Sequence, residues 1–327
     1  MIIMMQWRGG FAAALLMLAQ LWCCGAAIGQ AWPSRPVHII VPYGAGGGTD
    51  VLVRLLGNKF LEYTGQNFVL DNRPGAAGNI ASEQTAKARP DGLTALFASA
   101  SLAINATAYK TSAFDPLKDL QPISWVLSSP LVLCIHPSVQ AKSVQELVAL
   151  ARARKGEMNA ASAGTGSLGH LSIEMLKQLT GVDVVHVPYK GGAPAITGLV
   201  AGEVGFFFAS ALTSKPQIDA GRVRALAVTT AKRSTILPDL PPLGSIYPGF
   251  ELDQWYSLLY PAGTPADIVK KMNAEIVRAL RAPDVRAFLA KEGVDPVGST
   301  PEELGVFLRS EVGKYARMIK AGNLRFE

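Results

Sequence analysis

The chain has 327 residues, about the length of two average domains. Hydrophobic residues make up 49% and charged residues 17%, which predicts packed cores and excludes extensive disorder. The net charge is +6, but Lys and Arg are scattered rather than grouped in a basic run. We therefore expect no nucleic-acid partner and a modest attraction for anions.

The first 31 residues have the pattern of a secretory signal peptide. Arg8 precedes an apolar stretch, Phe11 to Trp22, and small residues follow at 25–29. We predict a signal peptide over 1–31, cleaved within 27–32, and a periplasmic mature protein. A retained membrane anchor is the alternative, although the apolar stretch is short for a spanning helix.

The cysteine count agrees with a protein that needs no disulfide. Removal of the signal peptide leaves Cys134 as a single cysteine, which has no internal partner. Its apolar neighbours, 131–135, predict a buried strand in which Cys acts as a small hydrophobe. A catalytic cysteine is the other reading, but no basic residues adjoin it.

Short apolar runs alternate with helical patterns along most of the mature chain, and each run is apolar throughout. Such runs are typical of parallel strands buried on both faces by helices. The predicted strands are 37–41, 68–70, 93–97, 158–161, 184–187, 204–208 and 223–228. The predicted helices begin near Asp50 or cover 80–87, 144–151, 168–179 and 193–200, and two more start at Thr264-Pro265 and Thr300-Pro301, each with Thr as N-cap.

Two longer apolar segments, Ile123 to Ile135 and Phe250 to Tyr260, flank the middle of the chain. We interpret them as crossover hinge strands that join two lobes. Lobe 1 would comprise 32–130 plus 252–327, and lobe 2 would comprise 131–251. The predicted fold is α/β and two-lobed, with parallel-rich sheets, helices on both faces, and a cleft.

The first segment that carries chemistry is a glycine-rich loop, 41–50, between a predicted strand and a predicted helix. Its four glycines allow positive φ and close backbone approach to a ligand. The helix start offers free N–H groups and partial positive charge, which suit carboxylate, phosphate or sulfate. Thr49 adds a hydroxyl donor, and Asp50 caps the helix or pins the loop. The alternative is a plain strand-to-helix turn.

A second glycine-rich loop, 161–170, lies in the same position between a strand and a helix. Its Gly164, Gly166 and Gly169 match the dinucleotide-binding spacing. No acidic residue ends the following strand to hold a ribose, and export disfavours a nucleotide cofactor. What the segment retains is backbone donors at a helix start, with the hydroxyls of Ser162, Thr165 and Ser167.

The remaining chemistry-bearing residues form no catalytic or metal-binding pattern. His170 would lie in the first helical turn, where we favour a neutral imidazole bonded within its lobe over a catalytic one. The other histidines show no metal-ligand spacing, and no Gly-x-Ser-x-Gly elbow occurs. We expect no enzyme activity, no metal and no cofactor. Tyr189, Ser99 and Ser101 follow predicted strands and could line the cleft.

An ordered set of motifs resembles the Bug (TctC-like) family, the periplasmic solute-binding receptors of tripartite tricarboxylate transporters. The resemblance runs from Trp32 to beyond residue 320. It is carried by Trp32-Pro33-Ser34-Arg35-Pro36, Ile40-Val41-Pro42-Tyr43, Gly46-Gly47-Gly48-Thr49-Asp50, Asp71-Asn72-Arg73-Pro74-Gly75-Ala76-Ala77-Gly78, Pro90-Asp91-Gly92, Ala161-Ser162-Ala163-Gly164-Thr165-Gly166, His186-Val187-Pro188-Tyr189-Lys190-Gly191, Arg224-Ala225-Leu226-Ala227-Val228-Thr229, Leu237-Pro238-Asp239 and Pro261-Ala262-Gly263-Thr264-Pro265.

The resemblance implies a two-lobed fold that grips a small carboxylate between the two glycine-rich loops, partly through bridging waters. Carried over residue by residue, the implied ligand-binding positions are Tyr43, Ala45, Gly46, Gly48, Thr49, Ser162, Gly164, Thr165, Gly166 and Ser167. A second set has a ligand-binding or structural role: Asp50, Ser99, His170, Tyr189 and Ala209.

One departure from the family pattern bears on the ligand. Many members have Asp after the strand that ends here at Phe208, whereas this chain has Ala209. An Asp there would hold an amino group, so its absence disfavours amino acids as ligands. Phe206 to Phe208 predict an apolar wall or a core strand. Mono-, di- and tricarboxylates, aromatic or not, remain open.

The sequence thus predicts a monomeric extracytoplasmic receptor that captures a small carboxylate and delivers it to membrane transporter subunits of the tripartite tricarboxylate type. An exported sensory co-receptor for a carboxylate is one alternative. A hydrolase on the same scaffold is a second, because a fold alone does not define function.

Overall fold

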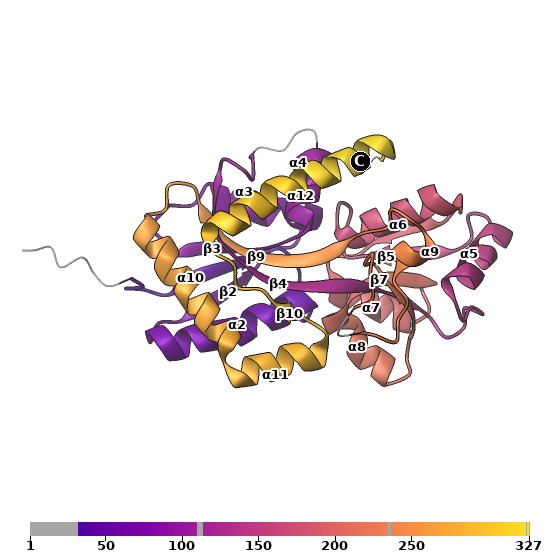
Figure 1. Cartoon of the computed structure of the whole chain (residues 1–327), viewed down its shortest axis with the longest axis horizontal. Coiled ribbons are helices and arrows are strands. Elements are labelled where there is room, and N and C mark those ends of the chain that lie inside the picture. Colours follow the sequence, from indigo (N-terminus) through magenta and orange to yellow (C-terminus); the bar gives the residue numbers. More distant parts are fainter. Residues whose placement is uncertain (1–31, 110–113, 235–236, 325, 327) are drawn as a thin grey trace, which may run out of the picture.

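A parallel three-stranded core forms the first half of the molecule in the computed structural model, which describes residues 32–109, 114–234, 237–324 and 326 (Figure 1). The predicted signal peptide lies outside the described residues. The strands β1 (Val37–Val41), β2 (Phe68–Asn72) and β3 (Thr94–Ser99) are ordered β2-β1-β3, and β9 (Asp253–Pro261) pairs antiparallel with β3. Its helices are α2 (Gly48–Thr64), η1 (Ala76–Gly78), α3 (Asn79–Ala86) and α4 (Ser101–Ala108).

The second half repeats this arrangement with the middle of the chain. Strand β5 (Asn159–Ser162) lies between β6 (Val185–Pro188) and β7 (Phe206–Ser210) and is parallel to both. Strand β8 (Arg224–Val228) pairs with β4. The helices of this half are α5 (Val144–Ala153), α6 (Leu168–Thr180), α7 (Gly192–Val200) and α8 (Ala211–Asp219).

One long strand, β4 (Leu120–Ile135), belongs to both halves (Figure 1). Its residues up to Pro130 pair with β9, and from Leu131 onward it pairs with β7 and β8. The chain returns through α9 (Leu243–Ile246) beside this point, because Thr229 N donates to Leu131 O and Leu252 N donates to Thr229 O. The two connections are therefore adjacent, as a hinge requires.

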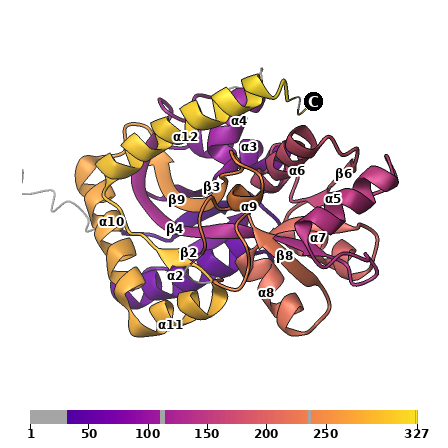
Figure 2. The same ribbon diagram turned by 45° about the vertical axis from the view of Figure 1, so that its right-hand side comes forward.

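The C-terminal helices cover the first half and reach the second. Helices α10 (Ala266–Arg281) and α11 (Pro283–Glu292) and strand β10 (Asp295–Pro296), which pairs with β4, precede α12 (Pro301–Ala321). Thr300 caps α12 in a capping box, as predicted. The expected cap at Thr264 is wrong: α10 starts at Ala266, and the Thr264 hydroxyl donates to Pro261 O instead. Figures 1 and 2 show α12 running along one side of the molecule towards α6.

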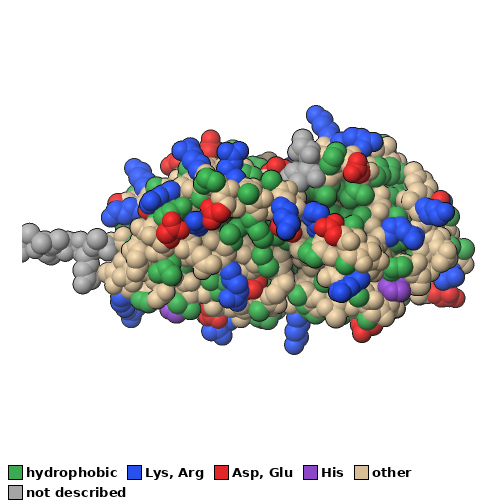
Figure 3. Space-filling model, turned by 90° about the horizontal axis from the view of Figure 1, so that it is seen from below, with side chains coloured by type: hydrophobic (Ala, Val, Ile, Leu, Met, Phe, Trp, Pro, Cys, Tyr) green, Lys and Arg blue, Asp and Glu red, His purple; other side chains and the backbone are tan. Residues whose placement is uncertain are grey.

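Most of the apolar strands are buried as their composition predicts, whereas β2 and β6, at the two ends of the sheet, expose Val69 and Val185. The two-lobed α/β fold is confirmed. Cys134 is fully buried in β4, and burial raises the pKa of its thiol to about 12, so it acts as a small hydrophobe. Among the described residues, no helix combines the length and apolar character needed to cross a membrane. On the face seen in Figure 3, basic and acidic side chains are interspersed.

Candidate ligand-binding site

A small chamber of about 60 Å³ lies between the two halves, next to the hinge. Both halves and the returning strand β9 contribute to its wall. The lining residues are Tyr43, Gly47, Gly48, Thr49, Ser101, Leu131, Ala163, Ser167, Leu168, Gly169, Gly192, Phe207, Phe208, Ser210, Thr213, Gln254 and Tyr256. None of these described residues is Asp, Glu, Lys, Arg or His, so the chamber wall carries no formal charge.

The N-terminal ends of five helices meet at this chamber. Its lining includes first-turn or N-cap residues of α2, α4, α6, α7 and α8. Four of these helices, all but α6, begin without a hydrogen bond from a side-chain cap. The first N–H groups of a helix lack partners within it, and each end carries roughly half a positive charge. An uncharged wall that presents five such ends is suited to an anion.

Two buried tyrosines add neutral hydroxyls to the wall. The Tyr43 hydroxyl lies 3.0 Å from Ser99 Oγ and 2.7 Å from Ser101 Oγ, and burial raises its pKa. Burial likewise raises the pKa of the Tyr256 hydroxyl, and the nearby side chains of Gln254, Thr49 and Ser210 lower it. Both phenols therefore stay protonated at neutral pH, where they can donate to a ligand.

A larger pocket of about 320 Å³ lies outside the chamber and shares Tyr43 and Ala163 with it. It is lined by the turn 74–77 from the first half and by 163–165 and 188–190 from the second. Lys190 is the charged residue in this lining and is exposed. The outer pocket therefore adjoins the chamber at Tyr43 and Ala163.

The contacts between the two halves involve backbone atoms and glycines of the two loops. Gly44 N donates to Lys190 O (3.4 Å), and the Tyr109 hydroxyl donates to Thr165 O (2.9 Å). A Cβ added to Gly48 would lie 2.8 Å from Ser210 Oγ, and one added to Gly166 would lie 2.5 Å from Asn105 Oδ1. Each glycine-rich loop thus packs against the opposite half: 44–48 against 190–193 and 210–213, and 164–166 against Ala77, Asn105 and Tyr109.

The structure divides the sequence-predicted residues into three groups. Tyr43, Gly48, Thr49 and Ser167 line the inner chamber. Gly164, Thr165 and Tyr189 line the outer pocket, where the Tyr189 hydroxyl donates to Glu203 Oε2 (3.0 Å). The others line neither cavity: Ala45 and Gly46 are exposed at the loop tip, and Asp50, Ser99, Ser162, Gly166, His170 and Ala209 lie behind the walls.

Asp50 pins the first loop rather than facing the ligand. Its carboxylate accepts from Gly46 N (3.1 Å), Arg54 Nε (2.9 Å) and Asn72 Nδ2 (3.1 Å). Burial alone would raise the pKa of this carboxyl, but these hydrogen bonds lower it below its ordinary value. Gly46 has φ +81°, a conformation that glycine adopts without strain.

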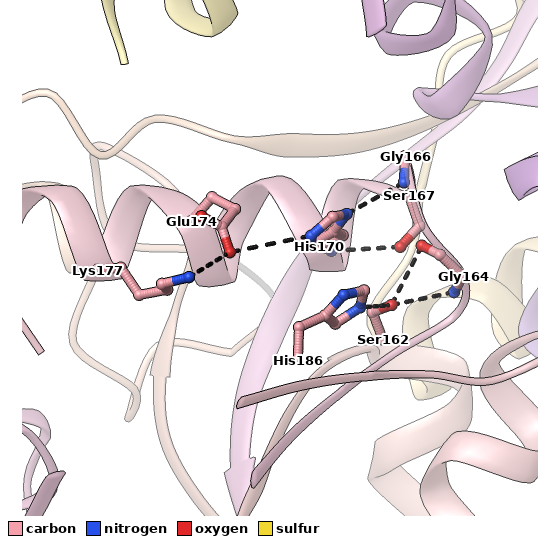
Figure 4. Close-up of polar contacts among 8 residues, drawn as sticks. All are labelled: Ser162, Gly164, Gly166, Ser167, His170, Glu174, Lys177 and His186. Carbon is pink, nitrogen blue, oxygen red and sulfur yellow. Dashed lines mark hydrogen bonds and ion pairs between the residues drawn. The ribbon is translucent and has the colours of Figure 1, made fainter. Parts of the chain in front are cut away.

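The residues behind the second loop form a polar cluster (Figure 4). Ser167 caps α6 by accepting from His170 N (3.2 Å), and Gly166 N donates to His170 Nδ1 (3.2 Å). Ser162 Oγ lies 2.6 Å from His186 Nε2. Burial lowers the pKa of His170 to about 3 and that of His186 to about 4. Both imidazoles are therefore neutral at neutral pH.

Several chamber residues were not among the predicted site positions: Ser210, Thr213, Gly192, Gln254 and Tyr256. Ser210, Thr213 and Gly192 lie at helix starts that follow strands, which is the same signal that marked the two glycine-rich loops. Gln254 is a nearly buried polar residue, 7% exposed, inside an apolar segment. That polar interruption is the one local signal the sequence offers for it.

Two α/β halves joined by adjacent connections, with an uncharged anion-suited chamber between them, form the architecture of a two-lobed solute-binding protein. The family model for the tripartite tricarboxylate transporter family receptor matches residues 52–324. The chain therefore belongs to this family, whose members are periplasmic solute-binding receptors rather than enzymes.

Individual relatives agree with this assignment. Protein BugT of Bordetella pertussis is 35% identical over 292 residues, 88% of this chain and 90% of its own length. A structure of an R. palustris protein with adipate is 35% identical, with a TM-score of 0.86, and covers 90% of this chain and 99% of its own. MatC from Rhodopseudomonas palustris with bound malate is 30% identical, with a TM-score of 0.84, and covers 88% and 100%.

Proposed function

We propose that this receptor captures a small organic carboxylate in the inner chamber and delivers it to membrane transporter subunits of the tripartite tricarboxylate type. The observation that carries the proposal is the meeting of five helix N-terminal ends at a chamber whose lining residues carry no charge. The adipate and malate found in two similar structures are both carboxylates, which supports the same ligand class.

The recognition chemistry follows from the donors in the wall. A carboxylate oxygen accepts hydrogen bonds from helix-start amides and from the hydroxyls of Thr49 and Ser167. The carbon skeleton packs on Phe207 and Phe208. Because no lining residue is acidic, the chamber offers no counter-charge to an ammonium group, and we infer that amino acids are excluded.

Binding is coupled to closure of the two lobes, proposed here as 32–130 plus 252–327 and 131–251. Donors from both lobes surround one chamber, so a carboxylate gains its full set of hydrogen bonds only when the lobes are closed. A ligand shifts a conformational equilibrium only by contacts that are better in one state, and this arrangement supplies them. The closed face is then the surface presented to the transporter subunits.

The proposal includes export. We propose that residues 1–31 direct the chain to the periplasm and are cleaved within 27–32. Mass spectrometry of the protein recovered from the periplasmic fraction measures the mature N-terminus. A product that begins within 27–32 is expected, and a cytoplasmic full-length product contradicts export.

The ligand class is tested by thermal shift and calorimetry with a panel of succinate, malate, adipate, citrate and benzoate. A ligand at 100 times its Kd stabilises a protein by about 2.7 kcal/mol, which raises Tm measurably. We expect at least one carboxylate to do so. Adipamide keeps the skeleton of adipate without its charge, and hexane-1,6-diamine carries positive charges instead, so neither should have an effect. The proposal is contradicted if no carboxylate of the panel raises Tm, or if adipamide binds as tightly as adipate.

A further inference from the structure

The ligand-facing loop of the second lobe rests on two stacked imidazoles. The rings of His170 and His186 lie with their centroids 3.7 Å apart and their planes 11° from parallel. The loop 162–167 bonds to both rings, as Figure 4 shows. The front of the same loop lines the two cavities through Gly164, Thr165 and Ser167. The pair therefore lies directly behind the backbone that faces the ligand.

The hydrogen bonds indicate where the proton lies on each neutral ring. Because Gly166 N donates to His170 Nδ1, that nitrogen carries no proton, and the proton of the neutral ring is on Nε2, 3.9 Å from Glu174 Oε1. Ser162 Oγ donates to Gly164 O and accepts from Gly164 N, both at 3.1 Å. A hydroxyl has one proton to give, so His186 Nε2 must be the donor to Ser162.

We propose that His170 and His186 are positioning residues, whose neutral stacked pair holds the loop 162–167 in its ligand-binding shape and releases it when protonated. The inference rests on the proposed function, because it gives the ligand loop its support. A proton on His170 Nδ1 would face the Gly166 N–H, so two donors would meet where one bond now exists. The loop must then move away from the position in which Thr165 O accepts from the Tyr109 hydroxyl of the other lobe.

The surroundings of the pair oppose a positive charge. His170 is 5% exposed, and the edge of Phe326 packs on its ring at 4.9 Å between centroids. The charged groups that face the pair among the described residues are Glu174 and Lys177 of α6, which pair with each other at 2.9 Å. Strands β5 and β6 contribute Ser162 and His186. Burial is the main cause of the lowered pKa of His170, and the charges of His186 and Lys177 add to it.

The expected acid response can be worked out from these values. An imidazole freed from the cluster returns to a pKa of about 6.5, whereas the values inside it are about 3 and 4. At pH 5.5 each ring therefore shifts the balance towards the released loop by about tenfold relative to pH above 7. A monocarboxylate such as benzoate, with a pKa of about 4, is still ionised at that pH, whereas di- and tricarboxylates lose part of their charge, so wild type and variant are compared with the same ligand.

The first test needs no ligand. Histidine ¹⁵N NMR of the purified protein at pH 7.5 should show Nδ1 of His170 unprotonated and both rings neutral. On acidification, the amide signals of Gly164 and Gly166 should move together with the two rings, with a midpoint well below pH 6.5. Rings that titrate near 6.5, or glycine amides that do not follow them, would overturn the proposal.

The second test separates positioning from packing with three variants. In His170→Asn, Oδ1 replaces Nδ1 as the acceptor and cannot titrate, so Kd for the panel carboxylate with the largest thermal shift should stay within threefold at pH 7.5. The loss of affinity between pH 7.5 and 5.5 should be smaller in His170→Asn than in the wild type, by up to about tenfold. His170→Phe keeps a ring without the acceptor and should weaken binding at least tenfold at both pH values. The control is His136→Asn, at a histidine bonded to Ser138 outside this cluster.

The outcomes remain distinguishable. If the wild-type protein binds no carboxylate, the proposed function is contradicted. The NMR titration still tests the role of the histidine pair, because it needs no ligand. Carboxylate binding with an identical pH profile in wild type and His170→Asn overturns the inference while the proposed function stands.

Discussion

Gly48 packs tightly against the opposite lobe beside the chamber, so Gly48→Ala is a direct test of lobe closure. Gly48 is the first residue of α2, where backbone geometry tolerates any residue. The added Cβ would lie 2.8 Å from Ser210 Oγ and 3.1 Å from Leu212 Cβ, both in the opposite lobe. The substitution therefore strains only the closed state and leaves the open state unaffected.

The magnitude follows from those contacts. A carbon–oxygen separation of 2.8 Å is not sustained, so Ser210 must rotate away from Thr213 Oγ1, its partner at 2.8 Å, or the lobes must separate by a few tenths of an ångström. Overpacking of this kind costs about 1–3 kcal/mol. Each 1.4 kcal/mol is tenfold in Kd, so affinity should fall by about 5- to 150-fold.

Isothermal titration calorimetry with the panel carboxylate of largest thermal shift measures this loss. Gly57→Ala is the matched control, because it lies on the same helix and its added Cβ would meet atoms no closer than 3.7 Å. We expect Gly57→Ala to keep wild-type affinity, and both variants to keep or slightly raise the unliganded Tm, because Ala favours helix over Gly by about 1 kcal/mol. If Gly48→Ala binds as tightly as wild type, the lobes do not close in the manner described.

Three further predictions address the site and its support. Tyr109→Phe removes the hydrogen bond to Thr165 O across the cleft, which is worth about 0.5–1.5 kcal/mol. Carboxylate binding measured by calorimetry should weaken about 2- to 10-fold. Unchanged affinity would show that the bond is absent from the bound form. Gln254→Glu places a nearly buried negative charge in the chamber wall and should weaken binding about 100-fold or more, whereas Gln254→Met should lose tenfold at most; equal losses would refute an electrostatic cause. The free energy of unfolding, measured in urea, should fall as pH drops from about 6.5 towards 4, because His170 and His186 bind protons in the unfolded chain but stay neutral in the folded protein. A variant with both histidines replaced by Asn should lose less stability over this range, and an unchanged slope would contradict the prediction.

The strands were predictable because most are buried on both faces. Runs such as 37–41 and 204–208 have no polar alternation, and the structure places them in the interior of the sheet. Helices α5, α6 and α7 were also predicted, since each follows a capping or glycine signal and carries apolar residues at helical spacing. In these elements the local pattern and the tertiary packing agree.

Two helices that open onto the chamber had no such pattern. Helix α4 is built from small residues and is buried over most of its surface, so it has no polar face to define a stripe. Helix α8 is short, largely polar and contains Pro216. Both are held by their neighbours rather than by propensity. The chamber positions Ser210 and Thr213 depend on helix α8, and this is why the chain alone revealed only part of the wall, whereas Ser101 of α4 was expected near the cleft from the strand that precedes it.

The position of Tyr256 depends on strand pairing over long sequence distances. Strand β9 reaches the chamber because it pairs with β3 on one side and β4 on the other, a register set by residues more than 100 positions away. Thr49 and Ser210, from opposite lobes, line the same chamber as this phenol. No local sequence motif predicts that residues so far apart in the chain will meet. A glycine-rich helix start, in contrast, is visible in the sequence because its backbone conformation requires glycine.

The absence of charge among the lining residues has a consequence for release. A buried arginine would bind a carboxylate strongly, but once the ligand left it would remain as an unpaired buried charge, which is costly in a closed chamber. Helix ends and neutral hydroxyls bind the same anion without that penalty, so the wall suits both the bound and the empty state. If the receptor closes on its ligand and later releases it to a transporter, as proposed, it gains from such a wall. Lys190, exposed in the outer pocket, can attract the anion without being buried with it.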